Sequence, residues 1–402
     1  MSQTAARESS SFLAASGACA SDVAPGIRRA GVRESDPAKA ARALADAILQ
    51  PDTRFAVFYC SPKYDLDQLG AALAQEFEGV DLIGCTTAGE ISPLGYTCDT
   101  LVGASLAGPE FTVVTSRIDE LSRFEVANGE ALASSMLEAL ASRGGPGSAT
   151  ASTFAFLLID GLSQQEEAIV SSIYQGLGNV PLFGGSAADE TRFQRTFVFH
   201  QGKFRADAAL VTLVRTERPC IVFKTQHFVS SEQRMVVTRA SPERRVVTEI
   251  NGAPAGREYA RMVGLEVDKL TPLIFSTYPV VVRVGGAYFV RSIQKVNDDE
   301  SLTFFCAIDE GIVLTVARGI DFVANLEHAF ADVSRKIGAP ELVLGCDCVL
   351  RNIEVSQRNL RDSVSRIFRD NNVIGFATYG EQFNAMHVNQ TFTGVALGRR
   401  GR

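Results

Sequence analysis

One short pattern occurs three times in this chain and limits the folds that the sequence can adopt. It reads LIGCTTAGE at residues 82–90, LFGGSAADE at 182–190 and VIGFATYGE at 373–381. In each copy an apolar pair precedes a glycine, small residues follow, and a glutamate stands six positions after the glycine. The chain therefore uses one local design three times.

Each copy ends a longer strand–helix–strand pattern. The apolar runs FAVFYC, FAFLLID and LVLGCDC lie about thirty residues before the three copies. Helical periodicity intervenes in every case, at residues 65–78, 164–177 and 354–368. Apolar strands that alternate with helices indicate a parallel sheet covered on both faces. We predict a two-domain α/β fold, built of strand–helix–strand units in mainly parallel or mixed sheets with β-rich additions.

The total composition excludes several classes of protein. Of the 402 residues, 46% are hydrophobic and 21% are charged, which is typical of a globular chain. The net charge of −7 disfavours a nucleic-acid surface, which needs a basic face. No apolar run approaches the roughly 18–20 residues that span a bilayer. Eight cysteines, several of them in apolar runs, indicate reduced thiols. We expect a cytoplasmic protein without nucleic-acid or membrane partners.

Changes of pattern along the chain suggest four segments. Residues 1–35 are rich in Ser, Ala, Gly and Arg, and we predict a flexible N-terminal tail there. Asp36 and Pro37 resemble a helix start and begin a predicted α/β domain over residues 36–222. A predicted α+β domain occupies residues 223–396, and residues 397–402 are expected to form a frayed C-terminus.

The three repeated corners are candidate pocket walls. Ligands of parallel sheets bind beyond the carboxyl ends of the strands, where small residues leave space and expose backbone N–H groups. The alternative is that each glycine permits a sharp turn and each glutamate caps a neighbouring backbone. We favour the pocket, and the candidate ligand-binding residues are Cys85, Thr86, Thr87, Gly89, Glu90, Gly184, Gly185, Ser186, Asp189, Tyr379, Gly380 and Glu381.

The same segments resemble a known family. GCTTAGEI, VPLFGGSAADE and TYGEQ with the later NQT are similar to the FIST family, which has an N-terminal and a C-terminal sensory domain. The resemblance implies that residues 36–222 are FIST N-like and residues 223–396 FIST C-like, with a small ligand and a role in signalling. FKTQHF, GCDCVLRNIE and YGEQFNAMHVNQTFTG further resemble the NosP branch. That branch implies haem b, nitric oxide sensing, and a separate histidine kinase or cyclic-di-GMP enzyme as partner.

Three of the four histidines are candidates for the axial ligand of such a haem, because imidazole commonly ligates its iron. His227, at the expected domain junction, is the first choice. His387, which follows the third corner, is the second, and His200, beside a turn, is the third. Each could instead be a structural strand histidine, and His328, in a helical pattern, is expected to have a surface or packing role. No CxxCH motif is present, so covalent haem is excluded.

Motifs for catalysis are weak, so we expect a binding protein and not an enzyme. No GxSxG elbow, P-loop or Rossmann glycine motif occurs. Asp160, Asp347 and Glu381 follow apolar runs, yet such carboxylates can simply pair with Arg351 or Arg283. The CxC at Cys346 lacks the second cysteine pair of a structural zinc site. The alternative to haem is a metabolite such as an amino acid, its carboxylate held by loop N–H groups.

Overall fold

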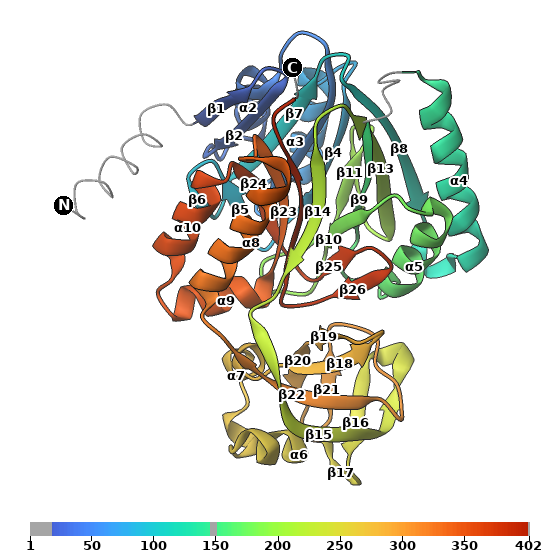
Figure 1. The fold of residues 1–402 in the computed structure, drawn as a ribbon, viewed down its shortest axis with the longest axis vertical. Coiled ribbons are helices and arrows are strands. Elements are labelled where there is room, and N and C mark those ends of the chain that lie inside the picture. The colour runs from blue at the N-terminus through green and yellow to red at the C-terminus, as the bar shows by residue number, and fades with distance from the viewer. Residues whose placement is uncertain (1–17, 145–150, 401–402) are drawn as a thin grey trace, which may run out of the picture.

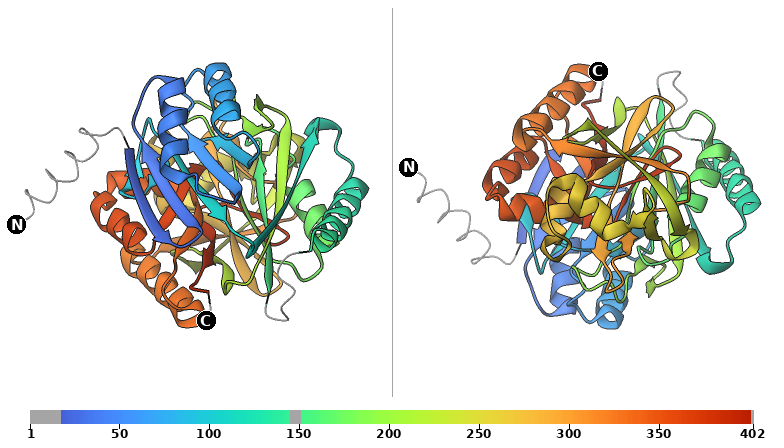
Figure 2. Two further views of the ribbon diagram at one scale, coloured as in Figure 1. Left: turned by 90° about the horizontal axis from the view of Figure 1, so that it is seen from above. Right: turned by 90° about the horizontal axis from the view of Figure 1, so that it is seen from below.

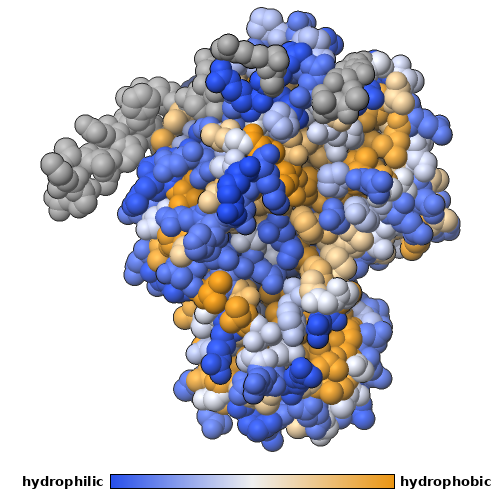
Figure 3. Space-filling model, in the orientation of Figure 1, coloured by the Kyte–Doolittle hydropathy of each residue, from blue (hydrophilic) through white to orange (hydrophobic). Residues whose placement is uncertain are grey.

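Each of the three repeated patterns folds as two parallel strands joined by helix. The computed structural model describes residues 18–144 and 151–400 and has the predicted mixed α/β fold. Residues 18–227 and 320–400 form a body of three sheets, and residues 228–319 form a smaller domain inserted into it. Figure 1 shows the inserted domain below the body, and Figure 3 shows it as a separate lobe.

The body consists of three units with the same order of elements. Unit one contains β2 (Ile27–Val32), α2 (Pro37–Ile48), β3 (Thr53–Cys60), α3 (Leu66–Glu76), β4 (Asp81–Thr86), β5 (Glu90–Ser92), β6 (Gly95–Thr97) and β7 (Leu101–Ala107). Unit two contains β8 (Phe111–Asp119), a short 3-10 turn at Leu121–Arg123, α4 (Val126–Ser142), β9 (Ser152–Ile159), α5 (Glu166–Leu177), β10 (Leu182–Ser186), β11 (Val198–His200), β12 (Lys203–Arg205) and β13 (Ala208–Thr216). Unit three contains β14 (Cys220–Thr225), α8 (Phe322–Ile337), β23 (Leu342–Cys348), α9 (Val349–Gln357), α10 (Arg361–Asp370), β24 (Val373–Thr378), β25 (Glu381–Phe383), β26 (Met386–Val388) and β27 (Phe392–Leu397).

Four strands of each unit form the centre of one sheet in the same spatial order. These orders are β2-β7-β3-β4, β8-β13-β9-β10 and β14-β27-β23-β24. The last two strands of each set are parallel, and the second strand is antiparallel to its neighbours on both sides. The predicted strand–helix–strand units are therefore confirmed, with further antiparallel strands beside them.

The hairpin that follows each parallel pair joins the sheet of another unit. The first hairpin (residues 90–100) pairs with β24, the second (198–208) with β4, and the third (381–391) with β10. The three exchanges form a closed ring. The hairpin of unit one extends the sheet of unit three, that of unit two extends the sheet of unit one, and that of unit three extends the sheet of unit two.

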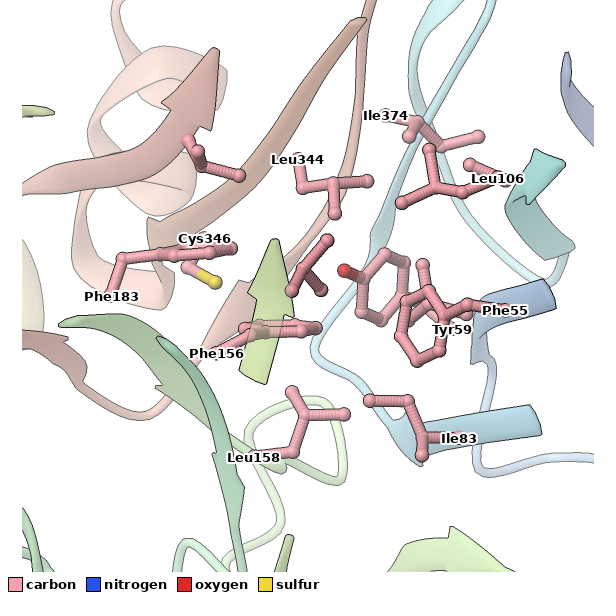
Figure 4. Packing of buried hydrophobic residues seen from close by; sticks show 14 of the residues in the cluster. Phe55, Tyr59, Ile83, Leu106, Phe156, Leu158, Phe183, Leu344, Cys346 and Ile374 are labelled. Atoms are coloured by element: carbon pink, nitrogen blue, oxygen red, sulfur yellow. The ribbon is translucent and has the colours of Figure 1, made fainter. Parts of the chain in front are cut away.

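Helices cover the outer faces of the sheets and apolar side chains fill the space between their inner faces. Figure 2 shows the helices in three groups around the outside of the body. One central cluster draws side chains from all three sheets, among them Tyr59, Phe156, Phe183 and Phe376 (Figure 4 shows this cluster). Tyr59 stacks on Phe376, and Phe156 stacks on Phe183, with ring centroids 4.5 and 4.6 Å apart.

The inserted domain has its own sheet and core. Its elements are β15 (Phe228–Ser241), a 3-10 turn at Pro242–Arg244, β16 (Val246–Ile250), β17 (Ala253–Pro254), α6 (Ala255–Val263), a 3-10 turn at Val267–Lys269, α7 (Pro272–Thr277), β18 (Val280–Val284), β19 (Ala287–Arg291), β20 (Ile293–Val296), β21 (Leu302–Phe304) and β22 (Val313–Gly319). Buried side chains from its sheet and from α6 and α7 form a separate cluster, including Tyr259, Phe275 and Leu314. The two crossings into the body are β14 to β15 and β22 to α8.

Several predicted boundaries need correction. Residues 1–17 lie outside the described part, but the expected tail is wrong for residues 18–32, where β1 (Ala18–Ala24) and β2 form because β2 pairs with β7. The single helical pattern predicted at 354–368 is two helices, since residues 358–360 separate α9 from α10. At the C-terminus, Leu397 lies inside β27 and Arg400 forms ion pairs with Glu110 and Glu217, so fraying does not begin at residue 397.

The sheets group the chain differently from a linear division at residue 222. Unit three begins at β14, and the inserted domain separates this strand from the remainder of the unit. Residues 223–396 therefore contribute to both the body and the inserted domain. The predicted helix start at Asp36 is confirmed, because the Asp36 carboxylate accepts a hydrogen bond from the Lys39 N–H.

Candidate functional site

The three repeated corners meet in one ring of backbone hydrogen bonds at the carboxyl ends of β4, β10 and β24. Ala88 N donates to Ala377 O, Ala188 N donates to Thr86 O, and Tyr379 N donates to Ser186 O, at 2.9, 2.9 and 3.3 Å. A second set donates in the opposite direction around the ring: Thr86 N to Phe197 O, Ser186 N to Gly380 O, and Ala377 N to Gly89 O, at 3.0, 2.8 and 2.7 Å. The three corners therefore converge, as predicted.

The N–H groups of this ring are engaged within the protein. Those of Gly89, Ala187, Asp189 and Glu190 also have partners inside the body. These N–H groups are therefore not free to hold a carboxylate. Cys85, Gly184 and Gly185 lie within strands, where Gly185 allows close packing, because a Cβ there would lie 2.8 Å from the ring of Phe376.

The glutamates of the first and third corners fasten their own hairpins. Glu90 accepts from the Thr87 hydroxyl at 2.5 Å, and from the N–H and hydroxyl of Thr100 at 3.2 and 2.7 Å. Glu381 accepts from the Thr378 hydroxyl at 2.5 Å, and from the N–H and hydroxyl of Thr391 at 3.2 and 2.7 Å. The alternative interpretation, a glutamate that caps a neighbouring backbone, is correct for these two corners.

The second corner departs from this pattern because its hairpin begins later. Asp189 accepts from the N–H groups of Phe193, Gln194 and Arg195 at 2.8–2.9 Å and from the Tyr379 hydroxyl. Glu190 instead has a φ of 62° and forms ion pairs at the surface. Asp189 also lines a surface groove of about 380 Å³, together with Tyr64, Asp65, Arg192, Gln194 and Arg195 among others.

The third hairpin carries buried polar side chains that have unused hydrogen-bonding atoms. We call Gln382, His387, Asn389 and Gln390 the third-hairpin cluster; each is at most 2% exposed. Within the described residues, Gln382 Oε1, His387 Nε2, Gln390 Oε1 and both amide atoms of Asn389 lack a partner. Gln382 Nε2 donates to Ser186 Oγ at 3.0 Å and lies 3.3 Å from His387 Nδ1.

Glycine at position 380 makes room for this cluster. A Cβ there would lie 2.6 Å from His387 Nε2 and 3.0 Å from Asn389 Nδ2. The glycine of the third corner therefore brings the histidine ring and the amide together. Sequence reasoning found His387 and Gly380 but missed Gln382, Asn389 and Gln390. Extending the comparison of the first and third corners by ten residues would have found them, since EISPLGYTCDT aligns with EQFNAMHVNQT without a gap.

The inserted domain covers the third-hairpin cluster. Arg291 Nη1 donates to His387 O at 3.2 Å, and Gln390 Nε2 donates to Phe275 O at 3.1 Å. Beside the cluster, Arg245 of the inserted domain pairs with Glu166 and Glu167 of α5, at 2.7 Å each. Burial lowers the pKa of His387 to about 4, so its ring is neutral at neutral pH.

His227 lies in a different buried network at the crossing between β14 and β15. Arg351 Nη1 donates to His227 Nδ1 at 3.0 Å, and Nε2 lies 2.9 Å from Glu354 Oε2. A guanidinium can only donate, so Nε2 carries the proton and donates to Glu354. Arg351 also pairs with Asp347, which accepts from the Tyr96 hydroxyl. For Asp347, the alternative of a carboxylate paired with Arg351 is therefore correct.

The remaining histidines lie away from the ring. His200 pairs with Ile83 on β4, at a groove of about 480 Å³, and its Nε2 is 3.7 Å from Asp81. His328 is exposed on α8, as expected. Within residues 18–144 and 151–400, no group of three or more His, Cys, Asp or Glu side chains is placed to hold a metal ion. No described helix combines the length and apolar character needed to cross a membrane.

Comparison with known proteins gives two family matches and more distant likenesses. Residues 54–253 match the FIST N domain, and residues 255–384 match the FIST C domain. An uncharacterized protein of Methanocaldococcus jannaschii is 22% identical over 370 residues, which cover 80% of this chain and 70% of that protein.

Two solved structures are also similar at low levels. A cyanuric acid hydrolase structure is 10% identical with a TM-score of 0.33, covering 92% of this chain and 99% of that one. The structure of T. maritima PurL complexed with FGAR is 11% identical with a TM-score of 0.20, covering 96% of this chain and 75% of that one. TM-scores this low support no inference about fold or function.

Proposed function

Because this chain carries FIST N and FIST C domains and so belongs to the FIST family, we propose that it senses a small organic ligand at the third-hairpin cluster. FIST domains are generally small-ligand sensor modules in signalling. The ligand would sit between the body and the inserted domain, where segments distant in sequence meet. Junctions of this kind are common places for ligand sites.

The unpartnered polar atoms of the cluster carry this proposal. A buried donor or acceptor without a partner costs about 1–3 kcal/mol. Among the described residues, the cluster has five such atoms, two of them on Asn389. A ligand with both donors and acceptors would satisfy them and recover that free energy. Amino acids have this chemistry, which supports the metabolite alternative.

Access to the cluster requires movement of the inserted domain. Two chain crossings join it to the body, at residues 227–228 and 319–320. Arg291 and Phe275 then meet the third hairpin only when the two parts are together. Ligand binding would favour the closed arrangement, which is a physical route from occupancy to a change of shape.

Haem, the cofactor implied by the NosP resemblance, fits these residues poorly. Both ring nitrogens of His227 are engaged, by Arg351 and Glu354, and its side chain is fully buried. His387 has an unpartnered Nε2 within the described structure, but its side chain is 2% exposed and packs so close to Gly380 that a Cβ there would lie 2.6 Å from Nε2. An axial ligand needs an accessible ring nitrogen, so we derive no step through haem and do not propose nitric oxide sensing.

The output of the sensor would pass through another protein. A histidine kinase or a cyclic-di-GMP enzyme is the partner that the family resemblance implies, and we retain it as part of the proposal. A cytoplasmic location and the absence of catalysis also belong to the proposal and follow from the sequence expectations above.

The test is a thermal-unfolding screen of the full chain against the standard L-amino acids and haem. A ligand at 100 times its Kd raises the free energy of unfolding by about 2.7 kcal/mol. We expect at least one amino acid to raise the Tm of the wild type and to have no effect on Asn389→Leu. Cys98→Leu, at the matching and exposed position of the first hairpin, is the control and should respond like the wild type.

Two outcomes would reject the proposal. One is a Tm that no amino acid changes. The other is an equal response in Asn389→Leu and the wild type. A Soret band that disappears in His387→Ala would restore haem as the ligand.

A further inference from the structure

We infer that the ligand of the third-hairpin cluster carries a carboxylate, which binds between Lys224 of the body and Arg291 of the inserted domain. This inference rests on the proposed function and specifies the ligand class at the same site. It also moves the carboxylate from the corner N–H groups, which are engaged, to two side-chain cations.

Lys224 is a cation without an acidic partner. It lies on β14 opposite Thr393 of β27, and its side chain is half-buried. Its Nζ donates to Gln226 Oε1 at 3.2 Å and lies 5.2 Å from the centre of the Phe289 ring. No carboxylate oxygen of the described residues lies within 4.0 Å of it. Burial lowers the pKa of Lys224, and the charge of Glu381 opposes that change.

The equivalent position of unit two shows what a structural cation looks like there. Arg117 on β8 faces Leu210, two residues after the second hairpin, just as Lys224 faces Thr393, two residues after the third. Arg117 Nε donates to both oxygens of Asp119, at 2.8 and 2.9 Å. Unit two supplies an acid for its cation and unit three does not.

Arg291 approaches the cluster from the inserted domain. Its Nη1 donates to His387 O, which is its one hydrogen bond within the described structure, and it forms no ion pair there. Phe289 and Arg291 are alternate residues of β19, so they share a face about 7 Å apart. Lys224 contacts Phe289 and Arg291 contacts His387, so both cations border the same junction.

A carboxylate between these cations fits the charges of the junction. A partly buried cation loses hydration, and an anion with good geometry restores it. The neighbouring acids Glu166, Glu167 and Glu381 are held by Arg245 or by threonine hydroxyls. The amides of the third-hairpin cluster then remain for the polar groups at the other end of the ligand.

The two cations also connect recognition with closure. Lys224 belongs to the body and Arg291 to the inserted domain, so one anionic group bridges the two parts. A neutral ligand could satisfy the amides but would leave the cations unpaired. We therefore expect the carboxylate to decide whether the inserted domain closes.

The experiment measures binding by calorimetry to the full chain. The probes are the standard L-amino acids and succinate, each compared with its amide. Loss of one hydrogen bond to a charged group costs about tenfold to a hundredfold in affinity. We expect Lys224→Met and Arg291→Met each to weaken the best carboxylate by that factor and to leave its amide unaffected. Lys295→Met removes an exposed cation nearby and should leave affinity unchanged.

Lys224→Arg keeps the charge, so it should retain binding and shows whether the position tolerates substitution. The inference fails if the amides bind as tightly as the carboxylates, or if both methionine variants bind like the wild type. If those variants bind normally while Asn389→Leu does not, the proposed site stands and the carboxylate inference alone is wrong. If Asn389→Leu also binds normally, the proposed site is wrong.

Discussion

The first and third hairpins have the same length and strand register but opposite chemistry. Each has eleven residues, is fastened by a Thr–Glu–Thr set, and has a residue of positive φ just before its last threonine, Asp99 at 57° and Gln390 at 51°. In the first hairpin, Ile91 and Tyr96 occupy the positions that Gln382 and His387 occupy in the third. The shared strand register does not require buried amides, so their presence in one copy marks a chemical difference between the hairpins.

The surroundings of the two hairpins explain part of this difference. Cys98 and Asp99 of the first hairpin are exposed, while their counterparts Asn389 and Gln390 are covered by the inserted domain. Tyr96 donates its hydroxyl to Asp347, whereas His387 retains an unpartnered nitrogen among the described residues. The polar groups of one copy are paired within the protein, and the other copy keeps polar atoms without a partner in the described structure.

The largest expected effect is on the support of the first hairpin. Asp347→Ala removes the acceptor of Tyr96 and leaves Arg351 buried without its carboxylate. Removing one partner of a buried ion pair costs about 3–5 kcal/mol. Urea unfolding should show that loss. Asp332→Ala, which breaks an exposed pair, should change stability by about 1 kcal/mol or less. Equal losses in the two variants would show that Asp347 does not support this hairpin.

A gain of stability is expected at the third hairpin. Asn389→Leu removes two polar atoms that lack partners in the described structure, so the ligand-free protein should gain about 1–3 kcal/mol. Thermal unfolding without ligand measures the change, and Cys98→Leu at the exposed counterpart should stay within about 0.5 kcal/mol. A clear loss of stability in Asn389→Leu would mean that the amide has a structural role.

The threonines that fasten the two hairpins should contribute equally to stability. Thr100→Val and Thr391→Val each remove one hydroxyl that donates to a buried glutamate at 2.7 Å. Each should cost about 1 kcal/mol, measured by urea unfolding. If the two losses of stability differ by more than about 1 kcal/mol, the threonines do not fasten the two hairpins equally.

The smallest expected effect is a difference in pH dependence. Burial raises the pKa of Glu90 to about 7 and that of Glu381 to about 8. A raised carboxyl pKa means that the folded state binds more protons, so its contribution is complete below about pH 4.5 and is lost as the pH rises through the folded value. Between pH 7 and 8, Glu381 should account for about 1 kcal/mol of the wild type's fall in stability, and Glu90 for less. Glu381→Gln should therefore reduce that fall more than Glu90→Gln does. Identical profiles for the two variants would contradict the difference between the sites.

The fold was predictable where local pattern decides it. The apolar run at 54–60 and the cap at Asp36 gave β3 and the start of α2, because periodicity and capping act over a few residues. The exchange of hairpins was not predictable, since three-residue strands such as β5 and β25 have no periodicity of their own. Pairing with a strand far along the chain decides their conformation.

The site was predictable only in part. Small residues correctly indicated that the corners converge, but composition cannot show whether N–H groups are free. The ring uses them internally, as Ala88 and Ala188 demonstrate. His227 stood out by its sequence position, yet its two nitrogens were assigned to Arg351 and Glu354 by contacts more than a hundred residues apart.

The closed exchange of hairpins makes the three units mutually dependent. A fragment that ended after β13 would leave β10 without β25, and the first hairpin without β24. Bare strand edges of this kind invite aggregation. The connection between β14 and α8 is different, since a whole domain is already inserted there without disturbing the exchange of hairpins. Fusion partners or reporters are therefore best inserted between β14 and α8. Cutting the protein into halves at the family boundary near residue 254 would instead break the exchange of hairpins.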